Sequence, residues 1–127
     1  MGLDMYAYTL PKDDIRPPVD FEIDNIPDWE RRNLHYWRKH PNLHGWMAER
    51  YFEKGGTSSD FNCNTVEITP DDLDVLERVI IANELPATTG FFFGETNGEE
   101  REDDLEFIRK AREEIAQGRS IAYYAWW

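Results

Sequence analysis

The chain has 127 residues, of which 40% are hydrophobic and 14% aromatic, so it is long enough and apolar enough to fold as a single domain with its own core. Its 26 acidic residues outnumber its 14 Lys and Arg and give a formal charge of -12, which argues against direct nucleic-acid binding and against docking on an anionic membrane. The first residues match no secretion leader and no apolar run has the length of a membrane span, so we expect a cytoplasmic protein.

The first half of the chain predicts one strand followed by two short helices. Residues 3–10 alternate in polarity and contain aromatic side chains, which is typical of a strand. Four prolines within residues 11–28 indicate an irregular connection. The aromatic and apolar positions of residues 29–39 suit a short helix. Pro41 interrupts that helix and starts a second one, which we expect to run to Lys54.

The second half predicts two helices and three strands. Residues 61–68 alternate as a strand does, and Pro70 opens an amphipathic helix behind a capping threonine. Residues 90–94 suggest a short buried strand, residues 100–117 a helix, and residues 121–127 a final strand. This order predicts an α+β fold: one compact domain with a mostly antiparallel sheet of about four strands and helices on one face.

A cluster of aromatic and cationic residues stands out in this acidic chain, because residues 29–50 hold five Lys or Arg and only two Glu. A cation beside aromatic rings binds an anionic group while a ring stacks on a planar one. The alternative is that the tryptophans are core residues and the cations are solvated. The ligand pocket that we expect is approached by the first strand and comprises Asp4, Tyr36, Trp37, Arg38, Lys39, His44 and Trp46.

Two further sets of residues have side chains that can bind a metal ion or act in nucleophilic catalysis. His35, His40 and His44 have the spacing of metal ligands, but Pro41 separates the last two, so we expect no metal and no cofactor. The single cysteine, Cys63, excludes an intramolecular disulfide. With His44 and Asp4 it would form a nucleophilic set, although a buried cysteine acting as a small hydrophobe is the simpler interpretation.

An acidic run opens the helix expected over 100–117. Carboxylates at a helix N-terminus are stabilised by the helix dipole, which is a sufficient structural reason for the run. The same run also has the chemistry to dock on a basic protein. The residues of this possible partner-binding face are Glu99, Glu100, Glu102, Asp103, Asp104 and Glu106.

Several motifs together resemble a family of small uncharacterised proteins encoded by bacteria and their phages. They are Met1-Gly-Leu-Asp-Met-Tyr6, Tyr36-Trp-Arg-Lys39 followed by His44 and Trp46, Asn62-Cys63, and the Leu-Pro-Ala-Thr-Thr-Gly-Phe-Phe-Phe-Gly sequence of residues 85–94. The resemblance spans nearly the whole chain. It implies a cytosolic protein of bacterial or viral origin, and it brings no established activity.

Three functions remain open from the sequence. The leading hypothesis is a small binding protein for an anionic or nucleotide-like ligand, which in a phage would serve counter-defence by sequestering a signal. The second is an acidic inhibitor, or nucleic-acid mimic, that binds a basic protein. The third is a hydrolase or transferase that uses Cys63 or His44. The sequence does not specify the oligomeric state.

Overall fold

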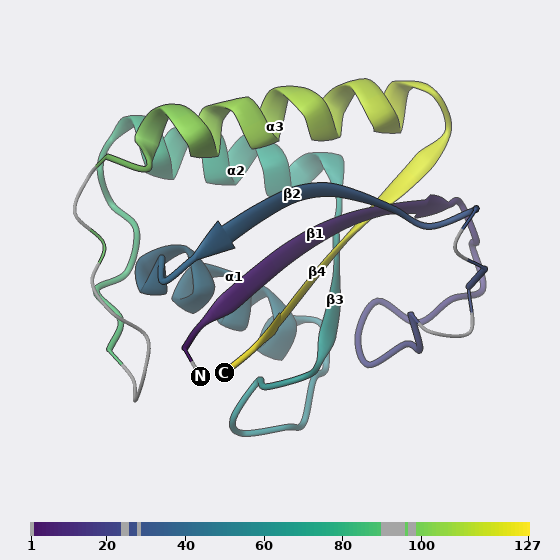
Figure 1. Ribbon diagram of the computed structural model, residues 1–127, viewed down its shortest axis with the longest axis horizontal. Coiled ribbons are helices and arrows are strands. Elements are labelled where there is room, and N and C mark those ends of the chain that lie inside the picture. Colours follow the sequence, from purple (N-terminus) through teal and green to yellow (C-terminus); the bar gives the residue numbers. More distant parts are fainter. Residues whose placement is uncertain (1, 24–25, 28, 90–95, 97–98) are drawn as a thin grey trace.

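A four-stranded antiparallel sheet organises the chain (Figure 1). The computed structural model describes residues 2–23, 26–27, 29–89, 96 and 99–127. The strand order is β2-β1-β4-β3, with all neighbours antiparallel, so the fold class expected from the sequence is confirmed. The strands are β1 (Asp4–Pro11), β2 (Arg32–Arg38), β3 (Thr65–Ile68) and β4 (Arg119–Trp126).

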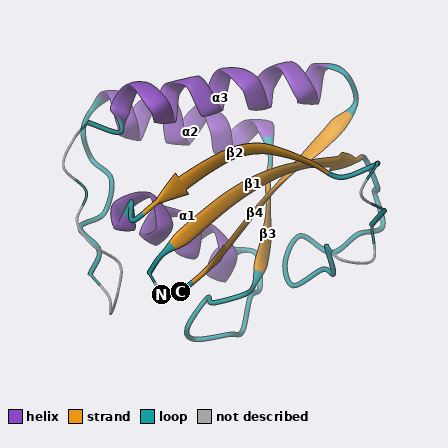
Figure 2. Ribbon diagram, in the orientation of Figure 1, coloured by secondary structure: helices purple, strands orange, loops and turns teal. Residues whose placement is uncertain are grey.

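Three helices cover one face of this sheet, here called the helix face (Figure 2). They are α1 (Pro41–Glu53), α2 (Pro70–Ile81) and α3 (Arg101–Ala116), close to the ranges that the sequence predicts. None of these described helices has the length and apolar character needed to cross a membrane. The main core lies between them and the sheet, and its fully buried members include Met5, Ala7, Leu43, Met47, Leu73, Leu76, Phe107, Ile108 and Tyr123.

The helix expected over residues 29–39 is wrong, because residues 32–38 form β2. Within β2 the side chains alternate: His35 and Trp37 are buried, whereas Tyr36 and Arg38 are exposed. This period of two is that of a strand, and pairing with β1 satisfies the backbone. Lys39 then adopts a left-handed φ of 54°, so the chain turns directly from β2 into α1.

The other differences from the sequence prediction lie at element ends. The strand expected over 61–68 shortens to β3, because Phe61 and Cys63 have φ values of 45° and 64° that a strand cannot hold. The strand expected over 90–94 lies outside the described residues. The described residues form four strands, and β2 is one of them in place of a predicted helix.

The chain before β2 covers part of the opposite face of the sheet. Phe21 and Ile23 pack on Leu10 and Ala122 in a small second core. The preceding residues also run along β3, since Glu67 donates its N–H to the carbonyl of Pro18 at 2.8 Å. None of the described helices lies on this face, and we call it the open face.

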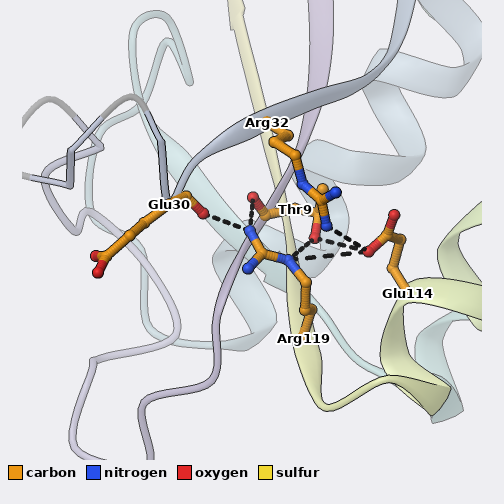
Figure 3. Close-up of polar contacts among 5 residues, drawn as sticks. All are labelled: Thr9, Glu30, Arg32, Glu114 and Arg119. Atoms are coloured by element: carbon orange, nitrogen blue, oxygen red, sulfur yellow. Dashed lines mark hydrogen bonds and ion pairs between the residues drawn. The ribbon is translucent and has the colours of Figure 1, made fainter.

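A cluster of polar side chains forms hydrogen bonds between the strands and α3 at one end of the sheet (Figure 3). Nε of Arg119 donates to the buried hydroxyl of Thr9 at 2.7 Å, and one Nη donates to the carbonyls of Thr9 and Glu30. The Thr9 hydroxyl in turn donates to Glu114 at 3.4 Å, and Glu114 also accepts from Arg32 at 3.1 Å. β1, β2, β4 and α3 therefore meet in one hydrogen-bonded group.

Removing the hydroxyl of Thr9 tests this connection. Thr9→Val keeps the side-chain shape but leaves Nε of Arg119 without its short hydrogen bond, so we expect a loss of about 1–2 kcal/mol in the free energy of unfolding. Thr57→Val at an exposed position is the matched control, and there we expect almost no change. Urea denaturation followed by circular dichroism measures both, and equal stability of the two variants would contradict the assignment.

Candidate functional site

A row of three tyrosines crosses the open face. Tyr6 and Tyr8 lie two positions apart on β1 and point to the same side, and their rings stack with centroids 6.0 Å apart and planes at 14°. Tyr36 on β2 is the cross-strand neighbour of Tyr6, with ring centroids 5.1 Å apart. We call Tyr36, Tyr6 and Tyr8 the tyrosine row. It offers flat aromatic surface on the face opposite the three described helices.

An ion-paired group stands at one end of the tyrosine row. The hydroxyl of Tyr36 donates to Oδ1 of Asp4 at 2.5 Å, and Nη1 of Arg38 donates to the same oxygen at 2.8 Å. The hydrogen bond from Tyr36 and the neighbouring guanidinium lower the pKa of Asp4, so this carboxylate is charged at neutral pH. The positive charge of Arg38 is therefore balanced within the protein.

A cavity of about 370 Å³ lies at the other end of the row. Its aromatic and apolar walls are Tyr8, Phe21, Ile23 and Tyr124. The guanidinium of Arg31 lines it too, with its central carbon 5.7 Å from the centroid of the Tyr8 ring. The connection that precedes β2 thus forms one wall and the sheet forms the other.

The polar lining of the cavity is held in place by hydrogen bonds. Asp20 accepts from the Tyr51 hydroxyl at 2.9 Å and from the Asn64 amide at 2.8 Å, and its own N–H donates to the carbonyl of Thr65. Oδ1 of Asn64 is buried, and within the described part of the chain it accepts no hydrogen bond. Glu22 adds a second carboxylate to the lining. The cavity therefore presents a positioned carboxylate, that of Asp20, together with the charges of Glu22 and Arg31.

The structure brings together only part of the predicted pocket. Asp4, Tyr36 and Arg38 converge on the open face, and Lys39 is exposed at the turn that follows β2. The ring of Trp37 lies in the core on the helix face. Trp46 belongs to the same core, and the ring of His44 packs on its members Phe61 and Tyr123. The residues of the pocket that we expected therefore lie on both faces of the sheet.

The contacts of His44 are those of a buried residue that stabilises the fold. Its Nδ1 shares a hydrogen bond of 2.7 Å with the buried hydroxyl of Tyr123, and its ring stacks on Phe61 with the centroids 5.2 Å apart. Burial lowers the pKa of His44 to about 4, so the imidazole is neutral at neutral pH. Cys63 lines the cavity on the open face, so the nucleophilic set of Cys63, His44 and Asp4 is not assembled.

The predicted acidic face is only partly a surface. Asp104 is buried and binds His40, which removes it from any docking surface. Asp103 lies 2.9 Å from His35, and Glu106 pairs with Arg109. Of the other members, Glu99 and Glu102 are exposed and Glu100 is half-buried. Across the described residues, no group of three or more His, Cys, Asp and Glu side chains is arranged to hold a metal ion.

The sequence analysis missed most of the cavity residues. Tyr6 and Tyr8 on one strand, with Tyr124 on another, carry a recognisable signal, since aromatic residues at alternate strand positions share a face. Phe21 and Arg31 carry none, because they lie in an irregular connection without periodicity. Comparison with known proteins finds no family model, no curated protein and no solved structure that matches this chain.

The buried His44 predicts a pH dependence of stability. Its pKa is about 4 in the folded protein and near 6.5 in an unfolded chain, so the unfolded state binds the proton more tightly. The resulting contribution is complete above about pH 6.5 and is lost as the pH falls to about 4, by up to about 3 kcal/mol.

His44→Gln keeps a neutral acceptor for Tyr123 and removes the titration. Urea denaturation at a series of pH values should show a smaller loss of stability between pH 6.5 and pH 4 in this variant than in the wild type. Parallel profiles for the two proteins would show that His44 does not titrate as its burial requires.

Proposed function

We propose that the protein binds a small planar ligand with one negatively charged group in the cavity on the open face. The observation that carries the proposal is the combination of the rings of Tyr8, Phe21 and Tyr124 with the guanidinium of Arg31 around one cavity. Its volume, about 370 Å³, falls in the range of small-molecule sites, which is about 300–1,000 Å³.

The walls favour a planar ligand. A ring entering the cavity contacts the faces or edges of Tyr8 and Tyr124, which are fixed because their strands pair through the backbone. Tyr6 continues the aromatic surface from Tyr8 toward Tyr36. A ligand longer than the cavity therefore has a second stacking surface along the tyrosine row.

The charges of the lining limit the charge of the ligand. Among the described residues of the lining, the carboxylates of Asp20 and Glu22 outnumber the guanidinium of Arg31, so they oppose the binding of a polyphosphate. A single carboxylate or phosphate facing Arg31 avoids most of that repulsion. The proposal is thus narrower than a nucleotide-like ligand in general: it favours a nucleoside monophosphate, a cyclic nucleotide or an aromatic acid.

The acidic-inhibitor hypothesis has less support. Asp104 is buried, Asp103 forms a contact of 2.9 Å with His35, and Arg109 offsets the charge of Glu106. The remaining exposed carboxylates, Glu99 and Glu102, are too few to imitate a nucleic acid. A cytoplasmic role in phage counter-defence stays a prediction from the family resemblance.

Two opposite charge changes in the lining test the proposal. Thermal shift and calorimetry against nucleoside monophosphates, cyclic nucleotides and aromatic carboxylates should identify a ligand. Arg31→Gln is expected to weaken its binding by about tenfold or more. Glu22→Gln is expected to strengthen it, because a repelling carboxylate is removed. Arg109→Gln, on the exposed surface of α3, is the matched control and should leave binding unchanged.

The opposite directions separate an electrostatic effect from general damage to the fold, which would weaken binding in both variants. The proposal fails if no member of the panel stabilises the protein, or if Arg31→Gln and Arg109→Gln bind the ligand equally.

Cys63 provides an independent reporter of occupancy. It is the only cysteine of the chain, its side chain is exposed, and it lines the cavity. We expect a bound ligand to slow alkylation of Cys63 by iodoacetamide, measured by mass spectrometry over time. The Cys63→Ser variant should bind with nearly the same affinity, because the thiol makes no part of the proposed recognition. An alkylation rate that does not change at saturating ligand would place the ligand elsewhere.

A further inference from the structure

A second cavity, of about 310 Å³, lies on the helix side of the molecule and contains a hydrogen-bonded chain of three side chains. Nε2 of His40 is 2.8 Å from Oδ2 of Asp104, and Nδ1 of His40 is 3.0 Å from the hydroxyl of Thr96. All three residues line the cavity. A hydroxyl, an imidazole and a carboxylate connected in this order form the arrangement that activates a hydroxyl nucleophile.

Asp104, at the carboxylate end of this hydrogen-bonded series, is buried and held in place. Asp104 is 1% exposed, and its other oxygen accepts a hydrogen bond of 3.0 Å from Nε1 of Trp37. His40 is also 1% exposed. Burying a histidine and an aspartate together costs free energy that two apolar side chains would not, so the pair needs a reason beyond packing.

The distances fit one tautomer of His40. Trp37 donates to one oxygen of Asp104. In the tautomer that carries its proton on Nε2, His40 donates to the other oxygen of an ionised Asp104, and its Nδ1 accepts from the hydroxyl of Thr96. The backbone N–H of Asn42 donates to the same Thr96 oxygen at 3.1 Å. Asn42 lies in the first turn of α1, where the helix dipole stabilises negative charge.

We propose that Thr96 and His40 are catalytic residues of an esterase site and that Asp104 is their positioning residue. The Thr96 oxygen attacks the carbonyl carbon of a carboxylic ester while its proton moves to Nδ1 of His40. The bond to the leaving alkoxide then breaks, and Nδ1 returns the proton to it as the alcohol departs. In the second half-reaction a water oxygen attacks the carbonyl carbon of the acylated Thr96 while a water proton moves to Nδ1 of His40. The bond to the Thr96 oxygen then breaks, that oxygen takes the proton back, and the carboxylic acid leaves.

The rest of the cavity suits a short acyl ester. Ile80 and Leu85 provide apolar lining for the acyl chain. Arg101 and Asn83 also line the cavity and offer N–H donors to the oxygen of the tetrahedral intermediate. This function is separate from ligand binding on the open face, because no residue among those described lines both cavities.

A purely structural role for Thr96 is the competing explanation, since its hydroxyl also satisfies an N–H in the first turn of α1. The experiment uses p-nitrophenyl acetate and p-nitrophenyl butyrate with the full chain. We expect a burst of p-nitrophenol that approaches one equivalent per protein, followed by slower turnover. Digestion of the quenched protein should show one acyl group on the peptide that contains Thr96.

The variants separate catalysis from folding. Thr96→Ala should abolish the burst and the acylated peptide, whereas Thr96→Ser should retain both. Asp104→Asn should keep substrate affinity, read as KM, and lower kcat by about 100-fold or more. Thr88→Ala is the matched control. Thr88 also lies beside the start of α1, where its N–H donates to Asn42, but its hydroxyl donates to the carbonyl of Pro86 and not to His40. It should retain the full burst, and circular dichroism checks the fold of each variant.

Two results overturn the proposal. One is the absence of a burst and of an acylated Thr96 peptide in the wild type with both esters. The other is acylation or turnover that persists in Thr96→Ala at the wild-type rate, which would assign the reactivity to other side chains.

Discussion

The pairing of β1 with both β2 and β4 determines which side chains can meet. β1 lies inside the sheet, and successive residues of a strand point to opposite faces, so its register sorts the chain into two environments. Met5 and Ala7 enter the core, while Asp4 and Tyr6 meet Tyr36 on the open face. A shift of one residue would exchange the two sets and remove the core together with the tyrosine row.

β2 connects the two candidate sites. Its inward residue Trp37 holds Asp104 in the helix-side cavity, and its outward residue Tyr36 holds Asp4 at the end of the tyrosine row. The left-handed Lys39 then places His40 at the start of α1, directly beside the strand. One short segment of seven residues and a turn therefore supports polar groups on both faces of the sheet.

The sequence predicts the elements whose signals are local. α2 has a capping box between Thr69 and Asp72, and α3 has regular apolar spacing, so both could be found without knowledge of their neighbours. β2 could not, because the same aromatic residues fit a helix in isolation and only pairing with β1 makes the strand favourable. The same pairing brings Asp4, Tyr36 and Arg38 together on the open face. The sequence places His44 and Trp46 in the same pocket, and in the structure they lie on the helix face. The wall of the open-face cavity comes from an irregular connection, which no periodicity could reveal.

The two outer strands of the sheet, β3 and β2, differ in what lies beside them. Residues 18–20 run beside β3 and form backbone hydrogen bonds to Thr65 and Glu67, so that side of the sheet is covered by the protein's own chain. β2 lies at the other side and carries Arg32 and Arg38. An outer strand can pair with another chain, and charged side chains along it disfavour such pairing because they would have to lose water. Arg32 and Arg38 are held along β2 by Glu114 and Asp4, so this strand presents ion-paired, hydrated side chains where a further strand would have to add.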